Sequence, residues 1–230
     1  MKIDTGDGFL GGESADLDRI LIWQGLDSWR SEVVNLRLGP RGLLARGSQV
    51  GVDPLPYRLE YQLEAPDDFV TERMTVEAQG AGWWRRLELR RSSTGVWSAR
   101  TEVEGAHPSL PEPSGEMASL AGAFDCDLGF SPLTNLMPIR RSGLDRQPGA
   151  EDFLMAWISV PSLEVLASGQ RYVHVGADEP GAVVRYVDQG LFPGYEANLQ
   201  LDRLGLVVHY PGLVKRVAAD STRGRRSAPG

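Results

Sequence analysis

The amino-acid sequence predicts an all-β protein with one minor short helix, folded as a large antiparallel roll or an incompletely closed barrel. Apolar and polar residues alternate strictly over residues 57–65, a pattern that gives a strand one buried and one solvated face. Short glycine-containing connections, such as residues 80–82 and 93–95, join strand candidates as hairpins rather than through crossover helices. No segment of about a dozen residues shows the apolar spacing of three to four residues that is typical of an amphipathic helix.

The strand candidates follow one another at the spacing of about ten residues that is typical of all-β proteins. They are residues 19–24, 29–38, 43–52, 57–65, 70–78, 83–91, 96–104, 153–160, 164–167, 171–176, 182–188, 197–202 and 206–209. The best short-helix candidate is residues 114–123, which Ser114 can cap. This many strands must curl, close or split into two sheets.

We expect one domain over residues 17–219, a flexible leader at 1–16 and a disordered tail at 220–230, where apolar residues are scarce. The formal net charge is -7, so generic nucleic-acid binding is excluded. The apolar runs are far shorter than the ~18 residues of a membrane-spanning helix. An acidic, glycine-rich start without an apolar stretch, together with a single cysteine, predicts a cytoplasmic protein.

Neither a metal nor a cofactor is expected. The three histidines, His107, His174 and His209, stand far apart and lack neighbours at ligand spacing. Residues 6–11 match GxGxxG, but they follow no strand and open no helix, so we interpret them as leader.

Two stretches carry candidate site residues. Trp83, Trp84, Arg85 and Arg86 place an indole followed by a guanidinium on each face of a strand, which suits a sugar ring or an anionic head group. The alternative is one tryptophan in the core, one on a rim, and solvated arginines. The densest stretch is 124–141, whose polar members are Asp125, Asp127, Asn135, Arg140 and Arg141. These charges form either a structural ion-pair cluster or the floor of a pocket, because buried charge needs compensation in both cases.

Residues 125–141 read DCDLGFSPLTNLMPIRR and resemble the bacterial glycolipid-binding protein family, whose hallmark is a DxDLGFSPxTNxxPIRR-like segment. Supporting matches are LIWQG at 21–25, WRSEVV at 29–34, AWISVPSL at 156–163 and DRLGLVVHYPGL at 202–213. The resemblance implies a single-domain spiral β-roll, similar to bacterial carriers that hold lipids or lipoprotein acyl chains. It supplies no catalytic residues.

The main hypothesis is a non-enzymatic binder of a glycolipid or another amphiphilic small molecule, with an acyl chain on the concave face of the sheet. Candidate wall residues are Leu59, Tyr61, Leu63, Val76 and Leu87. Candidate head-group residues are Trp83, Trp84, Arg85, Asp125, Asp127, Asn135, Arg140 and Arg141. One alternative is a hydrolase-type enzyme on a lipid-like or sugar substrate using Asp125 or Asp127. A second is a scaffold that uses its sheet edges. The oligomeric state stays open.

Overall fold

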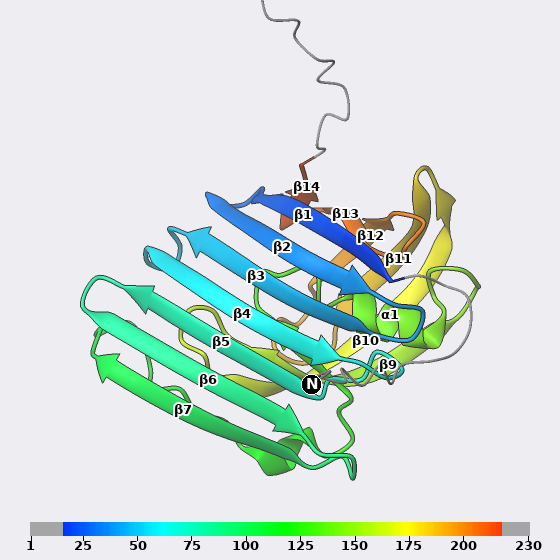
Figure 1. Ribbon diagram of the computed structural model, residues 1–230. Coiled ribbons are helices and arrows are strands. Elements are labelled where there is room, and N and C mark those ends of the chain that lie inside the picture. Colours follow the sequence, from blue (N-terminus) through cyan, green and yellow to red (C-terminus); the bar gives the residue numbers. More distant parts are fainter. Residues whose placement is uncertain (1–15, 218–230) are drawn as a thin grey trace, which may run out of the picture.

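One sheet of 14 strands makes up the protein, and the computed structural model describes residues 16–217 of it (Figure 1). The strand order is β7-β6-β5-β4-β3-β2-β1-β14-β13-β12-β11-β10-β9-β8. Two meanders therefore meet where the first strand pairs with the last. The all-β roll that the sequence predicts is confirmed, and the sheet is not closed into a barrel.

The N-terminal meander consists of seven antiparallel strands. They are β1 (Leu17–Gly25), β2 (Arg30–Leu38), β3 (Leu43–Gly51), β4 (Tyr57–Ala65), β5 (Arg73–Gly80), β6 (Trp83–Arg91) and β7 (Trp97–Gly105). Their burial alternates almost perfectly in β2, β3 and β4, so one face is core and the other is solvated.

The C-terminal half begins with a 3-10 turn and continues through seven strands and one helix. The elements are η1 (Met117–Leu120), β8 (Asp125–Leu128), α1 (Leu136–Ser142), β9 (Ala150–Ile158), β10 (Val165–Asp178), β11 (Gly181–Asp188), β12 (Glu196–Leu201), β13 (Val207–Tyr210) and β14 (Val214–Arg216). Within residues 16–217, no helix is long and apolar enough to cross a membrane.

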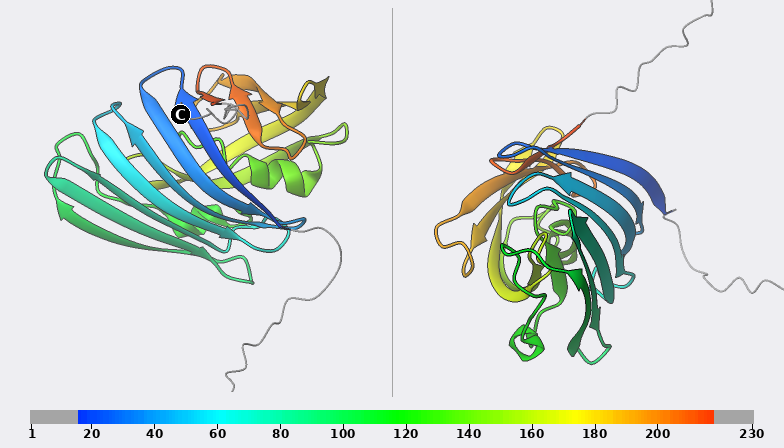
Figure 2. Two further views of the ribbon diagram at one scale, coloured as in Figure 1. Left: turned by 45° about the horizontal axis from the view of Figure 1, so that its top comes forward. Right: turned by 90° about the vertical axis from the view of Figure 1, so that its left-hand side faces the viewer.

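The sheet curls until its two edges approach each other (Figure 2). Residues just before β8 make single hydrogen bonds to residues at or near the ends of β5, β6 and β7. Trp97 Nε1 and Arg91 Nε both donate to the carbonyl of Ala123, at 3.1 and 2.9 Å, and Thr71 N donates to the carbonyl of Phe124 at 3.1 Å. We call this boundary the seam. It lacks the strand ladder that joins all other neighbours in the sheet.

The inner face of the N-terminal meander is layered. One row in register is apolar and runs through Leu36, Ala45, Leu63, Met74 and Leu89. A second row runs through Trp23, Glu32, Gln49, Leu59, Ala78 and Arg85 and carries three polar side chains. The face therefore changes from apolar at one end to polar at the other. Helix α1 packs at the apolar end, where Met137 Sδ lies 3.7 Å from Thr71 Oγ1.

Two glycines on β3 make room for tyrosine rings from β4. Gly47 lies directly opposite Tyr61, and Gly51 lies opposite Tyr57. A Cβ at either glycine would overlap the facing ring. These positions let both tyrosines lie flat over the sheet and bring their hydroxyl groups toward the polar row.

Some elements differ from the sequence-based expectation. The predicted helix over 114–123 is only the 3-10 turn η1, and strands 164–167 and 171–176 are one strand, β10. Strand β8 pairs parallel to β9, because it enters from the opposite edge rather than through a hairpin. Helix α1 and strand β14 were not expected. The predicted leader lies outside the described residues except for Asp16, and the predicted tail lies wholly outside them.

Candidate functional site

Residues 125–141, which we call the signature segment, run through the interior of the roll. Strand β8 lies at the sheet edge with all four residues buried. A turn at 129–135 reaches the polar row, and α1 then returns to the apolar end. The backbone of Phe130 has φ +65°, a strained conformation for a residue with a side chain, and such positions cluster at functional sites.

A bidentate ion pair anchors the two ends of the signature segment. Arg141 Nη1 and Nη2 donate to the two carboxylate oxygens of Asp125 at 2.6 and 2.5 Å. Burial raises the pKa of the Asp125 carboxyl, and the Arg141 guanidinium opposes that rise. The guanidinium also faces the rings of Phe124 and Phe153, at 5.2 and 5.6 Å. This part of the predicted charge cluster therefore has the geometry of a structural lock.

Asp127 is held by neutral partners. Its carboxylate accepts hydrogen bonds from Thr134 Oγ1 and Gln170 Nε2, both at 2.7 Å. Burial raises the pKa of Asp127 to about 6. Arg140, which the sequence places close by, lies 3.4 Å from Asp145 instead.

Asn135 precedes α1 and is buried, and its side-chain oxygen has no hydrogen-bond partner among residues 16–217. The signature segment thus brings Asp125 and Arg141 together, whereas Arg140 and Asp127 have other partners and the Asn135 oxygen has none among the described residues.

Glu32 on β2 is an interior carboxylate that the sequence reasoning missed. Its Oε1 accepts hydrogen bonds from Tyr61 Oη at 2.6 Å and from Ser131 Oγ at 2.7 Å. Its second oxygen, Oε2, has no partner within the described part of the chain. Burial raises the pKa of Glu32 to about 7. The sequence does indicate that Glu32 faces inward, because the alternation of β2 puts it on the same face as Val34 and Leu36.

Arg30 lies two residues before Glu32 on β2, so it faces the same side of the sheet, and it is also buried. Its Nη2 donates to Asp27 Oδ1 at 2.5 Å, and its guanidinium carbon lies 3.8 Å from the ring centroid of Phe130. Its Nε has no hydrogen-bond partner in residues 16–217. A buried arginine and a buried glutamate side by side, each with an unpaired polar atom, are unusual in a folded protein.

Gln49 and Tyr57 complete this region. The Gln49 amide donates to the Gly129 carbonyl, and Tyr57 Oη donates to Gln49 Oε1, both at 3.5 Å. These distances are at the upper limit for a hydrogen bond, so both groups retain bonding capacity. We define the polar corner as Arg30, Glu32, Gln49 and Tyr57, with Phe130 at its rim.

The wall residues predicted from sequence do line the inner face. Leu59 and Leu63 have no accessible surface, and Tyr61 is almost fully buried. Val76 and Leu87 are likewise fully buried. Side chains therefore cover the inner face and leave these wall residues almost no exposed surface.

The Trp83–Arg86 stretch divides between the two faces as the strand geometry requires. Trp83 and Arg85 are buried, whereas Trp84 is half-buried on the other face. The Arg85 guanidinium donates to the carbonyls of Ser162 at 2.9 Å and Leu110 at 3.1 Å, and also to that of Pro111. It ties the connection after β7 to the roll, so it belongs to a different cluster from Arg141.

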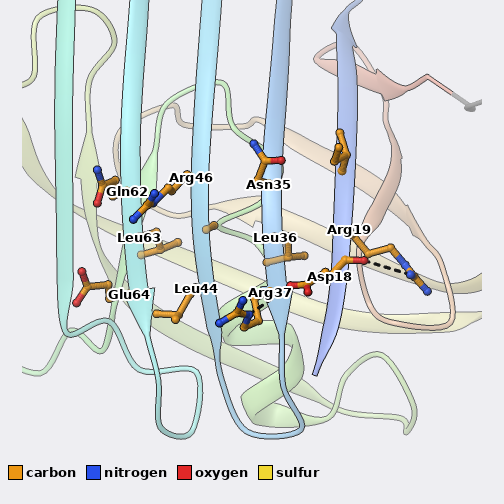
Figure 3. Close-up of a pocket in the computed structure, with 12 residues that line it drawn as sticks. Asp18, Arg19, Asn35, Leu36, Arg37, Leu44, Arg46, Gln62, Leu63 and Glu64 are labelled. Carbon is orange, nitrogen blue, oxygen red and sulfur yellow. Dashed lines mark hydrogen bonds and ion pairs between the residues drawn. The ribbon is translucent and has the colours of Figure 1, made fainter. Parts of the chain in front are cut away.

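A groove of about 800 Å³ lies on the outer face of β1 to β4 (Figure 3). Its lining includes Ile20, Arg37, Leu44 and Arg46, and Arg37 Nε lies 3.3 Å from the carboxylate of Asp18. None of the residues predicted as head-group contacts lines this groove, although Leu63 borders it from the inner row.

Comparison with known proteins agrees with this architecture. A crystal structure of a DUF1089 family protein from Pseudomonas aeruginosa has a TM-score of 0.63 and 24% sequence identity, covering 94% of this chain and 100% of that chain. A search of curated proteins finds no match. A family model described as "Putative glycolipid-binding" matches residues 20–216, almost the whole sheet. The chain therefore belongs to the family of this description.

Proposed function

We propose that this protein binds a glycolipid or a related amphiphile inside the roll, without catalysing a reaction. The family assignment supports this class of ligand. Asp125 and Asp127, the candidate catalytic carboxylates, are both engaged in short hydrogen bonds. We place the protein in the cytoplasm as part of the proposal, since its single cysteine excludes an internal disulfide.

The layered inner face is the observation that carries the proposal. Leu36, Ala45 and Leu63 belong to an apolar row, and Glu32 and Gln49 lie in the polar row toward the other end. An amphiphile has the same asymmetry. Its chain gains about 0.8 kcal/mol for each methylene that leaves water, while its head group needs polar partners.

Because the inner face is filled, a guest must displace interior side chains or the signature segment. The seam offers a route that unzips no strand ladder. Opening it breaks the hydrogen bonds of Trp97 and Arg91 with Ala123 and of Thr71 with Phe124 and Cys126. We therefore propose that the roll opens at the seam to admit the chain of the ligand.

The test is native mass spectrometry of protein purified without detergent and titrated with dodecyl maltoside below its micelle concentration. The proposal predicts a saturable complex of one ligand with one protein. A control variant, Ile20→Ser with Leu44→Ser, removes exposed apolar side chains from the outer groove and should bind equally well. Lack of a saturable complex would refute the proposed function, and lost binding in the control variant would move the ligand to the outer face.

A further inference from the structure

We propose that the polar corner is a binding site for the hydroxyl groups of a sugar head group. This inference rests on the proposed function, because it assigns the head group of the same ligand. The corner lies at the polar end of the inner face, and the rows beside it supply the apolar surface for a chain. The ligand class is a neutral polyol attached to an alkyl or acyl chain.

The first support is the pair of unpaired atoms at the corner. Arg30 Nε is a donor, Glu32 Oε2 is an acceptor, and neither has a partner among the described residues. Leaving such a buried group unpaired is unfavourable, and more so when it is charged. A hydroxyl group both accepts and donates a hydrogen bond. Sugar hydroxyl groups can therefore satisfy both atoms, one accepting from Arg30 Nε and one donating to Glu32 Oε2.

The second support is the reserve capacity of the other two groups. Gln49 donates to the Gly129 carbonyl and accepts from Tyr57 Oη, and both contacts are 3.5 Å, the limit of a hydrogen bond. The Gln49 amide and the Tyr57 hydroxyl can therefore give up these long contacts and form shorter hydrogen bonds with a ligand at little cost. Together the four side chains present donors and acceptors in similar numbers, as a polyol requires.

The charge of the corner argues for a neutral ligand rather than a phosphate. Arg30 is its one cation, and two carboxylates, Asp27 and Glu32, lie beside it. An anionic group would meet net repulsion. A sugar ring also presents an apolar face, and the half-buried Phe130 ring stands at the rim with Arg30 on one side.

The corner is close to solvent even though its unpaired atoms are covered. Asp27, which holds the Arg30 guanidinium, has a side chain that is 42% exposed, and Phe130 is half-buried. A small movement of the 26–29 turn or of the Phe130 ring would therefore admit the head group from the end of the roll, while the chain enters along the seam.

The experiment compares two ligands with the same twelve-carbon chain: dodecyl maltoside, which carries a sugar, and dodecyldimethylamine oxide, which does not. Glu32→Gln removes the acceptor charge and keeps the shape of the side chain. We expect it to weaken dodecyl maltoside binding at least tenfold and to change amine oxide binding less than twofold. Glu60→Gln, the same change at an exposed position of β4, should alter neither affinity.

Gln49→Met is the second variant, because it removes a head-group partner that makes only 3.5 Å contacts in the free protein. It should produce the same selective loss, and it decides the question if Glu32→Gln fails to fold. Equal affinity of the folded variants and wild type for dodecyl maltoside would overturn the head-group site and leave the proposed function standing. Failure of wild type to bind either ligand would instead refute the proposed function.

Discussion

Replacing Arg141 by methionine tests whether the ion pair with Asp125 locks the signature segment. The Arg141 side chain is 13% exposed and Asp125 is fully buried. In the Arg141→Met variant, the Asp125 carboxylate keeps its burial and loses the one charged hydrogen-bond partner that it has among residues 16–217. A buried charge without compensation is strongly unfavourable, so the folded state should lose stability rather than merely one contact.

The size of the loss follows from burial. Breaking a buried ion pair by removing one partner costs about 3–5 kcal/mol, whereas an exposed pair contributes about 0–1 kcal/mol. For a domain of this size, 3–5 kcal/mol corresponds to a decrease in Tm of roughly 6–20 °C. Arg171 provides the matched control, since it also contacts both oxygens of an aspartate, Asp152, but the two side chains are 41% and 56% exposed.

Urea denaturation followed by tryptophan fluorescence measures both variants. Arg141→Met should lower the free energy of unfolding by about 3–5 kcal/mol, and Arg171→Met should lower it by less than about 1 kcal/mol. Adding Asp125→Leu to Arg141→Met should recover much of the loss, because the uncompensated carboxylate is then gone. Equal effects of the two single variants would refute the assignment of Asp125 and Arg141 as a buried lock.

Two further predictions concern interior groups. Burial raises the folded-state pKa of Glu32 to about 7 and that of Asp127 to about 6, so their protonated forms stabilise the fold and this contribution is lost as pH rises from about 4 to 7. As the pH rises from 5 to 8, the free energy of unfolding of Glu32→Gln should increase by on the order of 3 kcal/mol relative to that of wild type. A difference between the two proteins that does not change with pH in denaturation experiments would contradict the raised pKa of Glu32. Gly47→Ala forces a Cβ into the Tyr61 ring and should destabilise the protein by about 1–3 kcal/mol. The control is Gly176→Ala, whose Cβ points into open space and which should destabilise the protein by less than about 1 kcal/mol. Equal melting temperatures of the two variants would count against the packing described for Tyr61.

The alternation of side chains was sufficient to predict most of the sheet. Strands such as β2, β3 and β4 bury every second residue, and hairpin turns fix the order of neighbours. The periodicity of a segment does not identify a partner strand that is distant in sequence. The β1–β14 pair and the parallel β8–β9 pair could therefore not be predicted from it. Helix α1 is seven residues long and contains Pro138, which leaves too little pattern for a prediction.

The candidate site was predicted in part. Closeness in sequence predicted a carboxylate–guanidinium pair in the signature segment, and Asp125 with Arg141 forms it. Arg140 is the adjacent residue on a helix, where neighbours point in different directions, so it reaches Asp145. Arg30 and Glu32 were missed because charged residues usually face solvent, and two of their interior partners, Phe130 and Ser131, come from a segment about a hundred residues later.

The most direct test of the account is a lock across the seam. Thr71 Oγ1 lies 3.6 Å from the sulfur of Cys126, the single cysteine of the chain, so Thr71→Cys creates one possible internal disulfide. Oxidation with diamide should then slow dodecyl maltoside uptake at least tenfold, and reduction should restore it. Thr71→Cys combined with Cys126→Ser should respond to neither treatment. Uptake by the oxidised, disulfide-locked protein at the rate of the reduced protein would contradict ligand entry through the seam.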